Sequence, residues 1–223
     1  MLVATYNVRH GRPWRGFTTN EWLARSIARL DADILAVQEV ERRVVRSYFA
    51  DQPTLIAEAA GAEGRAYAPA RRLAFTGTDG VALLVRGSVL HHHVMRFKGR
   101  EGRQNRVAIV AGVQVGDRTL SVVATHLQAH ADDAKQQLGE LLDAMATLPR
   151  PRLLLGDLNL APSDVAGPCA AAGLTLAGGA RSAPAFRPTQ RLDHIAVDGM
   201  ALGEVEVRRL PVSDHRAVVA ELT

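Results

Sequence analysis

The sequence holds a single cysteine and no long apolar run. Cys169 has no partner for an internal disulfide, which fits a reducing compartment. Its neighbours Pro168 and Ala170 favour a buried helix residue over a nucleophile. No apolar stretch approaches the roughly 20 residues that a membrane span needs, and the N-terminus lacks the pattern of a signal peptide. We therefore expect a cytoplasmic protein without a membrane span.

Lysine is also scarce. Only Lys98 and Lys135 are lysines, so almost all the positive charge is arginine, and the formal net charge is +4. A basic excess suits phosphate-bearing partners, although arginine usage can equally reflect the nucleotide composition of a genome. The 223 residues are 47% hydrophobic, enough for one sizeable core, and show no repeat or linker. We expect one domain over residues 1–223, and a monomer.

Short strands and helices follow one another in a mixed order. Apolar runs predict strands at 2–6, 34–37, 122–127, 153–155 and 192–197, with later strands at 205–209 and 217–222. Helical spacing and caps predict helices at 21–30, 51–61, 132–148 and 163–172. Hairpin-linked strands fill residues 66–124. Such an order predicts mixed sheets covered by helices, an α/β (α+β) sandwich.

One buried strand ends in two polar residues. The leucines 153–155 read as a strand buried on both faces, and Asp157 and Asn159 follow at its tip with Leu158 turned inward. A strand tip on a rigid scaffold is a usual place for chemistry. The alternative is that Asp157 and Asn159 only cap the helix that starts near Ser163.

The same pattern recurs at other strand ends and loop entries. Asn7 can be read as a turn residue, Glu39 as a solvated acid and His126 as a core histidine, but their shared context favours a site. Carboxylates and amides at sheet tips suit Mg²⁺, which prefers oxygen ligands, and no Cys/His cluster has zinc spacing. The residues so placed are Asn7, Glu39, His126, Asp157 with Asn159, Asp193, and Asp214 with His215.

Three consecutive histidines, His91 to His93, lie within a predicted strand. Alternation along a strand places His92 on the opposite face from the other two, which is poor geometry for a metal site. We expect a solvated edge strand here.

Seven motifs in this order resemble those of the endonuclease/exonuclease/phosphatase superfamily, over about residues 2–222. They are Thr5-Tyr6-Asn7-Val8, Val37-Gln38-Glu39-Val40, Gly80-Val81-Ala82-Leu83-Leu84, Ala124-Thr125-His126-Leu127, Leu155-Gly156-Asp157-Leu158-Asn159, Leu192-Asp193-His194-Ile195 and Ser213-Asp214-His215. The resemblance implies a deoxyribonuclease-I-like, four-layered sandwich, in which two packed mixed β-sheets are flanked by helices and the site lies at one rim.

The resemblance also implies roles. Glu39 would be the main ligand of Mg²⁺, for which Mn²⁺ can substitute, with Asn7 close to the metal and Asp214 a further ligand. Asp157 and Asn159 would position the attacking water and a phosphate oxygen. His215, oriented by Asp193, would contact the phosphate or act as general base, and His126 would bind a phosphate oxygen or act as general acid. Whether Asp157 or His215 takes the proton from the water stays open.

Several arginines lie on the predicted tip loops, where they either grip phosphates or solvate the rim. Arg9 and Arg106 are the candidates for substrate phosphate; the others are Arg12, Arg15, Arg103, Arg187 and Arg191. The loop 12–17 and the segment 42–79 are short, which leaves little room for DNA-gripping insertions and argues against a dedicated DNA-repair role.

The leading hypothesis is a Mg²⁺-dependent phosphodiesterase or nuclease that acts on a phosphate ester, with nucleic acid among the candidate substrates. The first alternative is a phosphomonoesterase on a sugar or lipid-headgroup phosphate. The second is a non-catalytic module that binds phosphate or nucleic acid. A binder tends to lose its metal acid or its histidine, and here both are present.

Overall fold

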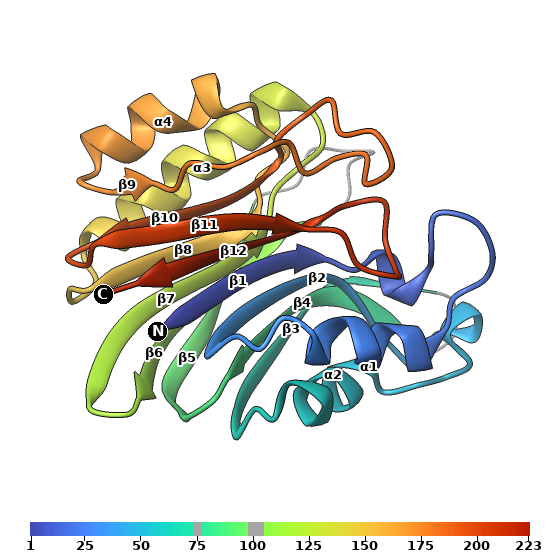
Figure 1. Ribbon diagram of the computed structural model, residues 1–223. Coiled ribbons are helices and arrows are strands. Elements are labelled where there is room, and N and C mark those ends of the chain that lie inside the picture. The colour runs from blue at the N-terminus through green and yellow to red at the C-terminus, as the bar shows by residue number, and fades with distance from the viewer. Residues whose placement is uncertain (74–76, 98–104) are drawn as a thin grey trace.

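A computed structural model describes residues 1–73, 77–97 and 105–223. Two six-stranded sheets pack face to face, and a pair of helices covers the outer face of each (Figure 1). The predicted four-layered sandwich of two mixed sheets flanked by helices is therefore confirmed.

The first sheet has the strand order β11-β12-β1-β2-β4-β3. β1 and β2 run parallel, and the other neighbours are antiparallel. The bounds are β1 Leu2–Asn7, β2 Ile34–Arg42, β3 Gly64–Arg72, β4 Thr78–Val85, β11 Leu202–Arg208 and β12 Ala217–Leu222.

The second sheet has the order β5-β6-β7-β8-β10-β9. Only β7 and β8 are parallel neighbours. The bounds are β5 Ser88–Arg96, β6 Val107–Val115, β7 Arg118–His126, β8 Arg152–Asp157, β9 Thr175–Leu176 and β10 Asp193–Asp198.

Local signals explain where the helices begin and end. The Thr19 side chain accepts a hydrogen bond from the Trp22 amide at the start of α1, and Gly61 ends α2 with a φ of 63° that suits glycine. The helices are α1 Asn20–Ala28, α2 Gln52–Ala60, α3 Ala131–Ala146 and α4 Pro162–Ala171, with short 3₁₀ turns η1 Arg9–Gly11 and η2 Val45–Ser47.

The strand β8 shows how the layers are held together. Leu153 and Leu155 face the core between the two sheets, while Leu154 packs with residues of α3 and α4 on the other side. Burial on both faces explains the unbroken run of leucines, because neither side of this strand meets water.

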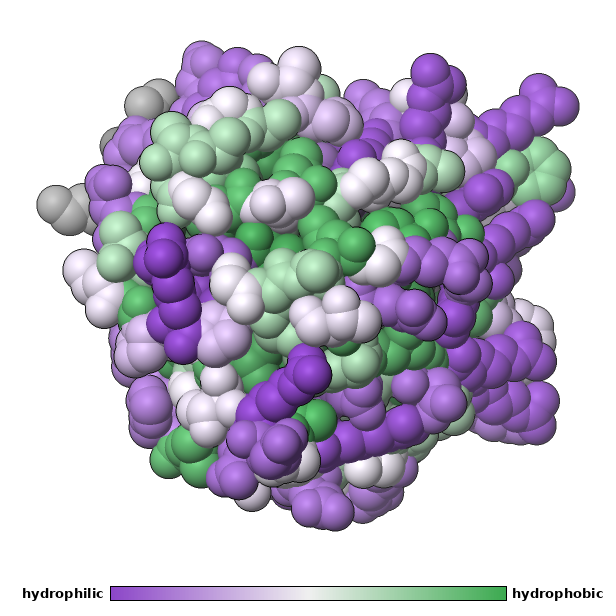
Figure 2. Space-filling model, turned by 60° about the vertical axis from the view of Figure 1, so that its left-hand side comes forward, coloured by the Kyte–Doolittle hydropathy of each residue, from purple (hydrophilic) through white to green (hydrophobic). Residues whose placement is uncertain are grey.

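Smaller predictions can be judged as well. Cys169 is buried in α4, and the three histidines lie exposed on β5, which is an edge strand as predicted. Within the described ranges, no helix is long and apolar enough to cross a membrane. Figure 2 turns the end that carries both termini toward the viewer, and hydrophobic side chains gather in the middle of that face.

Candidate active site

The polar strand tips meet at one edge of the sandwich. β1 and β2 end there, as do β7 and β8, and the antiparallel strands β10 and β12 begin there (Figure 1). The Asn7 side chain at the end of β1 joins the two sheets. Its Nδ2 donates to Glu39 Oε1 at 3.1 Å and to Asp157 Oδ2 at 3.0 Å.

Asp157 is the centre of this cluster. Besides the bond from Asn7, its Oδ2 lies 3.5 Å from His126 Nε2 and 3.8 Å from His215 Nδ1, and the Asn159 amide donates to its Oδ1 at 3.1 Å. Burial, together with the charge of Asp193, raises the pKa of Asp157 to about 7. The helix-capping alternative is wrong, since the N-cap of α4 is Ala161.

His215 is paired with Asp193. Its Nδ1 lies 2.8 Å from Asp193 Oδ2, and both side chains are almost enclosed. Burial works to lower the pKa of His215, but the nearby carboxylates of Asp193 and Asp157 outweigh it and raise the pKa to about 10. A protonated ring with Nδ1 engaged leaves Nε2–H as the group that can meet a substrate.

The predictions from the sequence missed Ser213. Its hydroxyl donates to the Asn7 carbonyl at 2.6 Å, and the His215 amide donates to the same hydroxyl oxygen at 3.0 Å. Ser213 has a φ of 78°, in the left-handed region that a serine seldom adopts. It ties the loop before β12 to the end of β1. The Ser213-Asp214-His215 motif could have indicated this role of Ser213, but roles were assigned from the sequence only to Asp214 and His215.

His126 is held in one tautomer. Arg106 Nη1 lies 3.1 Å from His126 Nδ1, and because arginine only donates, Nδ1 is the acceptor and Nε2 carries the proton. Burial, reinforced by the Arg106 charge, lowers the pKa of His126 well below its ordinary value. His126 is therefore a neutral hydrogen-bond donor that faces Asp157.

The predicted phosphate-binding arginines differ in their surroundings. Arg9 Nε lies 3.4 Å from Asp214 Oδ2, beside the site, whereas Arg106 supports His126. Arg191 donates to the Ala177 carbonyl and lines a pocket together with Asn159. Arg12, Arg15 and Arg187 are exposed, and Arg103 lies outside the described residues.

The comparisons with known proteins identify the family and the fold. The family model described as "Endonuclease/Exonuclease/phosphatase family" matches residues 4–215. The chain belongs to this family. No protein in a curated set matches the sequence.

Solved structures of endonuclease/exonuclease/phosphatase proteins share the fold. A protein of this family from Beutenbergia cavernae is 21% identical with a TM-score of 0.80, over 100% of this chain and 71% of that one. A mannosyl-6-phosphatase from Bacteroides thetaiotaomicron is 18% identical with a TM-score of 0.74, over 100% and 99%. Truncated TDP2 from Caenorhabditis elegans is 21% identical with a TM-score of 0.73, over 99% and 96%.

Glu39 is the residue of this endonuclease/exonuclease/phosphatase chain best suited to a divalent cation. It lies at a bulge of β2 with a φ of 56°, and burial raises its pKa, which marks a carboxylate short of positive charge. His10 Nδ1 is 3.8 Å from Glu39 Oε2, but burial and nearby arginines lower the pKa of His10 to about 3, so its ring is neutral. The donors present, oxygens of Glu39, Asn7 and Asp214, fit Mg²⁺.

A second grouping of ligand-type atoms lies beside Glu39. Asp157, Asp193 and His215 each offer one atom, all within 4.8 Å of one another. The His215 nitrogen in reach is already bonded to Asp193, so this trio is an internal hydrogen-bonded cluster in the structure. Which of these oxygens hold a metal stays a prediction.

Proposed function

We propose that this protein is a Mg²⁺-dependent phosphodiesterase of the nuclease type. The observation that supports it is the convergence of Asn7, Glu39, Asp157 and the Asp193–His215 pair, from five strands of both sheets or their loops, at one rim. Phosphoryl transfer needs charge neutralisation and positioning more than covalent help, and this set offers both.

We assign Asp157 as the general base that takes the proton from the attacking water. Its pKa of about 7 lets it accept a proton at neutral pH, and the Asn7 and Asn159 hydrogen bonds fix its carboxylate. His215, with its pKa raised to about 10, carries a proton already and presents Nε2–H to a phosphate oxygen.

His126 and Asn159 complete the phosphate contacts in this proposal. The neutral Nε2–H of His126 donates a hydrogen bond where negative charge develops. Glu39, Asn7 and Asp214 would hold Mg²⁺, with Mn²⁺ as a substitute, and Arg9 lies beside them. The chemistry that such a cation supplies is neutralisation of charge on the phosphate and placement of its oxygens.

The test is hydrolysis of bis-nitrophenyl phosphate, a diester, and of nitrophenyl phosphate, a monoester, with Mg²⁺, Mn²⁺ or EDTA. We expect the diester to be hydrolysed with either metal and not with EDTA. Glu39→Ala and His215→Ala lower kcat by roughly 10²-fold or more, the scale of losing a positioned catalytic group. Matched controls are the exposed Glu58→Ala and His92→Ala, which leave kcat unchanged.

The outcomes separate the candidate functions. Turnover of the monoester alone would favour the phosphomonoesterase alternative. Binding without hydrolysis of either ester would favour the non-catalytic module. Near-wild-type turnover by Glu39→Ala or His215→Ala would reject the assignment of these residues.

A further inference from the structure

Two short loops border the rim and carry much of the charge of the chain. The first rim loop, residues 8–19, joins β1 to α1, and the second, residues 43–51, joins β2 to α2. Together they hold five arginines and one aspartate, so their net charge equals the +4 of the whole chain. Arg9 and Arg46 pair with Asp214 and Glu41, and the other three arginines leave positive charge exposed beside the proposed site.

The same loops display large hydrophobic side chains to solvent. Of the eight exposed in the described part of the chain, five lie on the two rim loops. Tyr48 is 70% and Phe49 62% exposed, and Phe17 on the first loop is 85% exposed. Scattered single apolar residues are normal on a surface, but a group of rings among arginines at one edge indicates a binding surface.

Tyr48 and Phe49 are held outward by a strained turn. Their φ angles are 57° and 58°, a left-handed conformation that costs a bulky residue of the order of 1 kcal/mol or more. Backbone hydrogen bonds impose it: the Tyr48 amide donates to the Val45 carbonyl at 2.9 Å, and the Phe49 amide to the Val44 carbonyl at 2.8 Å. Strain of this kind persists where the surrounding structure fixes it, and it is common at functional sites.

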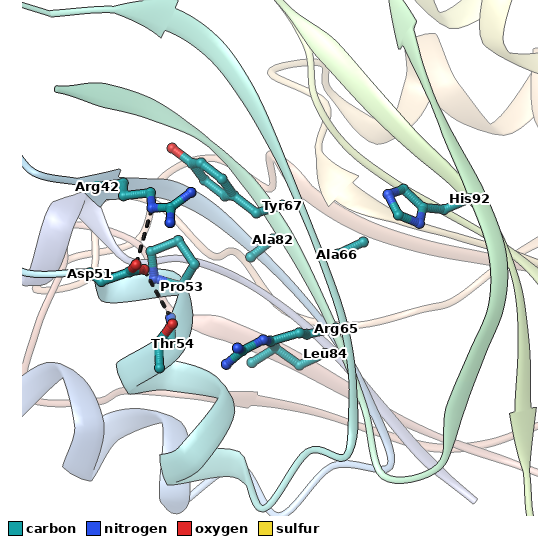
Figure 3. A pocket seen from close by; sticks show the side chains of 10 residues that line it. All are labelled: Arg42, Asp51, Pro53, Thr54, Arg65, Ala66, Tyr67, Ala82, Leu84 and His92. Atoms are coloured by element: carbon teal, nitrogen blue, oxygen red, sulfur yellow. Dashed lines mark hydrogen bonds and ion pairs between the residues drawn. The ribbon is translucent and has the colours of Figure 1, made fainter. Parts of the chain in front are cut away.

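The second rim loop is also anchored at its base. Figure 3 shows Arg42 and Thr54 joined to Asp51, at 3.0 Å and 3.3 Å, where the loop meets α2. Asn20 Nδ2 donates to the Ser47 carbonyl at 3.1 Å, which ties this loop to the first helix. The two rings are thus presented by a rigid support, and little ordering entropy remains to be lost on binding.

The first rim loop connects this surface to the proposed site. His10 lies 3.8 Å from Glu39, Arg9 lies 3.4 Å from Asp214, and the Ser213 amide donates to the Arg12 carbonyl at 2.7 Å. A polymer held by the loops can therefore place a phosphate at the rim cluster.

We infer that Tyr48 and Phe49 form a base-stacking platform for single-stranded nucleic acid, and that the loop arginines contact its phosphates. This inference rests on the proposed phosphodiesterase function, because the platform would hold the substrate of that site. Rings beside cations match the alternation of bases and phosphates along a strand. Insertion into a membrane is disfavoured, because Arg15 lies between Trp14 and Phe17 in the first rim loop and its charge would enter the bilayer with them. The shortness of the loops excludes inserted DNA-gripping segments but does not prevent two rings from stacking.

The direct test is binding of a fluorescein-labelled single-stranded oligonucleotide in EDTA, followed by fluorescence anisotropy. We expect Tyr48→Leu/Phe49→Leu to raise Kd roughly 30-fold or more, since each of the two stacked rings contributes about 1 to 3 kcal/mol. Tyr48→Trp/Phe49→Trp restores the affinity, because it restores the rings. Leu90→Ala, which removes an exposed apolar residue of β5 in the other sheet, leaves Kd unchanged.

Further readouts keep the proposal separate from the proposed function. The oligonucleotide is bound in EDTA, where the proposed hydrolysis of bis-nitrophenyl phosphate does not occur, so the binding test does not depend on catalysis. If the wild type does not hydrolyse that diester, the proposed function fails while the binding test still stands. Circular dichroism checks that the leucine variant is folded.

Two outcomes would overturn the platform. One is a Kd for the oligonucleotide that the leucine variant leaves unchanged. The other is binding to phosphatidylserine vesicles that survives in the leucine variant while the wild type shows no affinity for the oligonucleotide, which would assign the surface to a membrane. Arg43→Gln adds a salt readout: the slope of log Kd against log salt falls by about 0.7 if this arginine meets a phosphate.

Discussion

At the scale of the residue, the pairing of Asp193 with His215 sets the protonation of the proposed site. The Asp193 carboxylate raises the pKa of His215, and it also raises that of Asp157. Asparagine at position 193 still accepts a hydrogen bond but carries no charge, so it separates orientation from electrostatics.

We predict that Asp193→Asn moves both limbs of the pH profile of kcat to lower pH. His215 then loses its proton at a lower pH than the wild-type value of about 10, and Asp157 becomes deprotonated below its wild-type value of about 7. Hydrolysis of bis-nitrophenyl phosphate across the pH range measures both limbs. A lower kcat with an unmoved profile would show that Asp193 acts on structure alone.

His194 makes stability depend on pH. It is fully buried, Nε2 donates to the Leu160 carbonyl at 2.9 Å, and burial lowers its pKa to about 4. Below pH 6.5 the unfolded chain takes up a proton at this residue and the folded chain does not, so stability falls with pH until about pH 4.

We predict that His194→Gln removes this dependence, because glutamine keeps a donor and has no proton to gain. When the pH is lowered from 7 to 4, the free energy of unfolding of the wild type should fall by roughly 2 to 3 kcal/mol more than that of the variant. Urea unfolding at each pH measures it. A constant difference between the two proteins would contradict the prediction.

Residue types at strand tips could be read from the sequence, but their partners could not. Asp157, Glu39 and His215 were all assigned roles before their contacts were known. Two neighbours that define their chemistry, His10 and Ser213, were missed, since both reach the site through a positive φ that neither residue type favours. The sequence predicted the hairpin of β6 and β7, but not the side-chain contact between Arg106 and His126.

At the scale of the element, the second rim loop exposes two aromatic rings at a cost in stability. We predict that Tyr48→Gly raises the free energy of unfolding by about 0.5 to 1 kcal/mol, because glycine adopts the left-handed conformation without strain and the exposed ring contributes little burial. The same variant should bind the oligonucleotide more weakly. Thermal and urea unfolding measure the first effect, and a loss of stability would contradict it.

The strand β8 depends on Gly156, where backbones approach closely. A Cβ at this position would lie 2.5 Å from the Thr125 carbonyl oxygen of the neighbouring strand β7. We predict that Gly156→Ala destabilises the protein by roughly 1 to 3 kcal/mol, the usual cost of overpacking. The matched control is Gly139→Ala in α3, where nothing lies within 4 Å, which should stabilise by about 0.5 to 1 kcal/mol. If urea unfolding shows the same change in the free energy of unfolding for Gly156→Ala and Gly139→Ala, the close approach at Gly156 is refuted.

Most elements were predictable because their signals are local. Thr19 and Gly61 mark helix ends by capping, and the leucines of β8 mark a strand without water on either face. The outward turn at Tyr48 and Phe49 was not predictable, because it is imposed by backbone hydrogen bonds against the preference of both residues.

At the scale of the whole molecule, the two sheets act together. The first sheet contributes Asn7 and Glu39, and the second contributes Asp157 and Asp193, so neither sheet alone carries the proposed site. The layered fold followed from the resemblance of seven ordered motifs, whereas composition and periodicity alone indicated only a mixed sandwich. The contact that joins the sheets, Asn7 to Asp157 at 3.0 Å, required the structure.

The central claim is that residues far apart in the chain serve one reaction, and a double variant tests it most directly. We predict that Glu39→Ala/His215→Ala hydrolyses bis-nitrophenyl phosphate with a kcat within about threefold of the slower single variant, since groups that act as a unit are not additive. Losses in kcat that multiply, so that the double variant shows the product of the two single effects, would contradict a shared site.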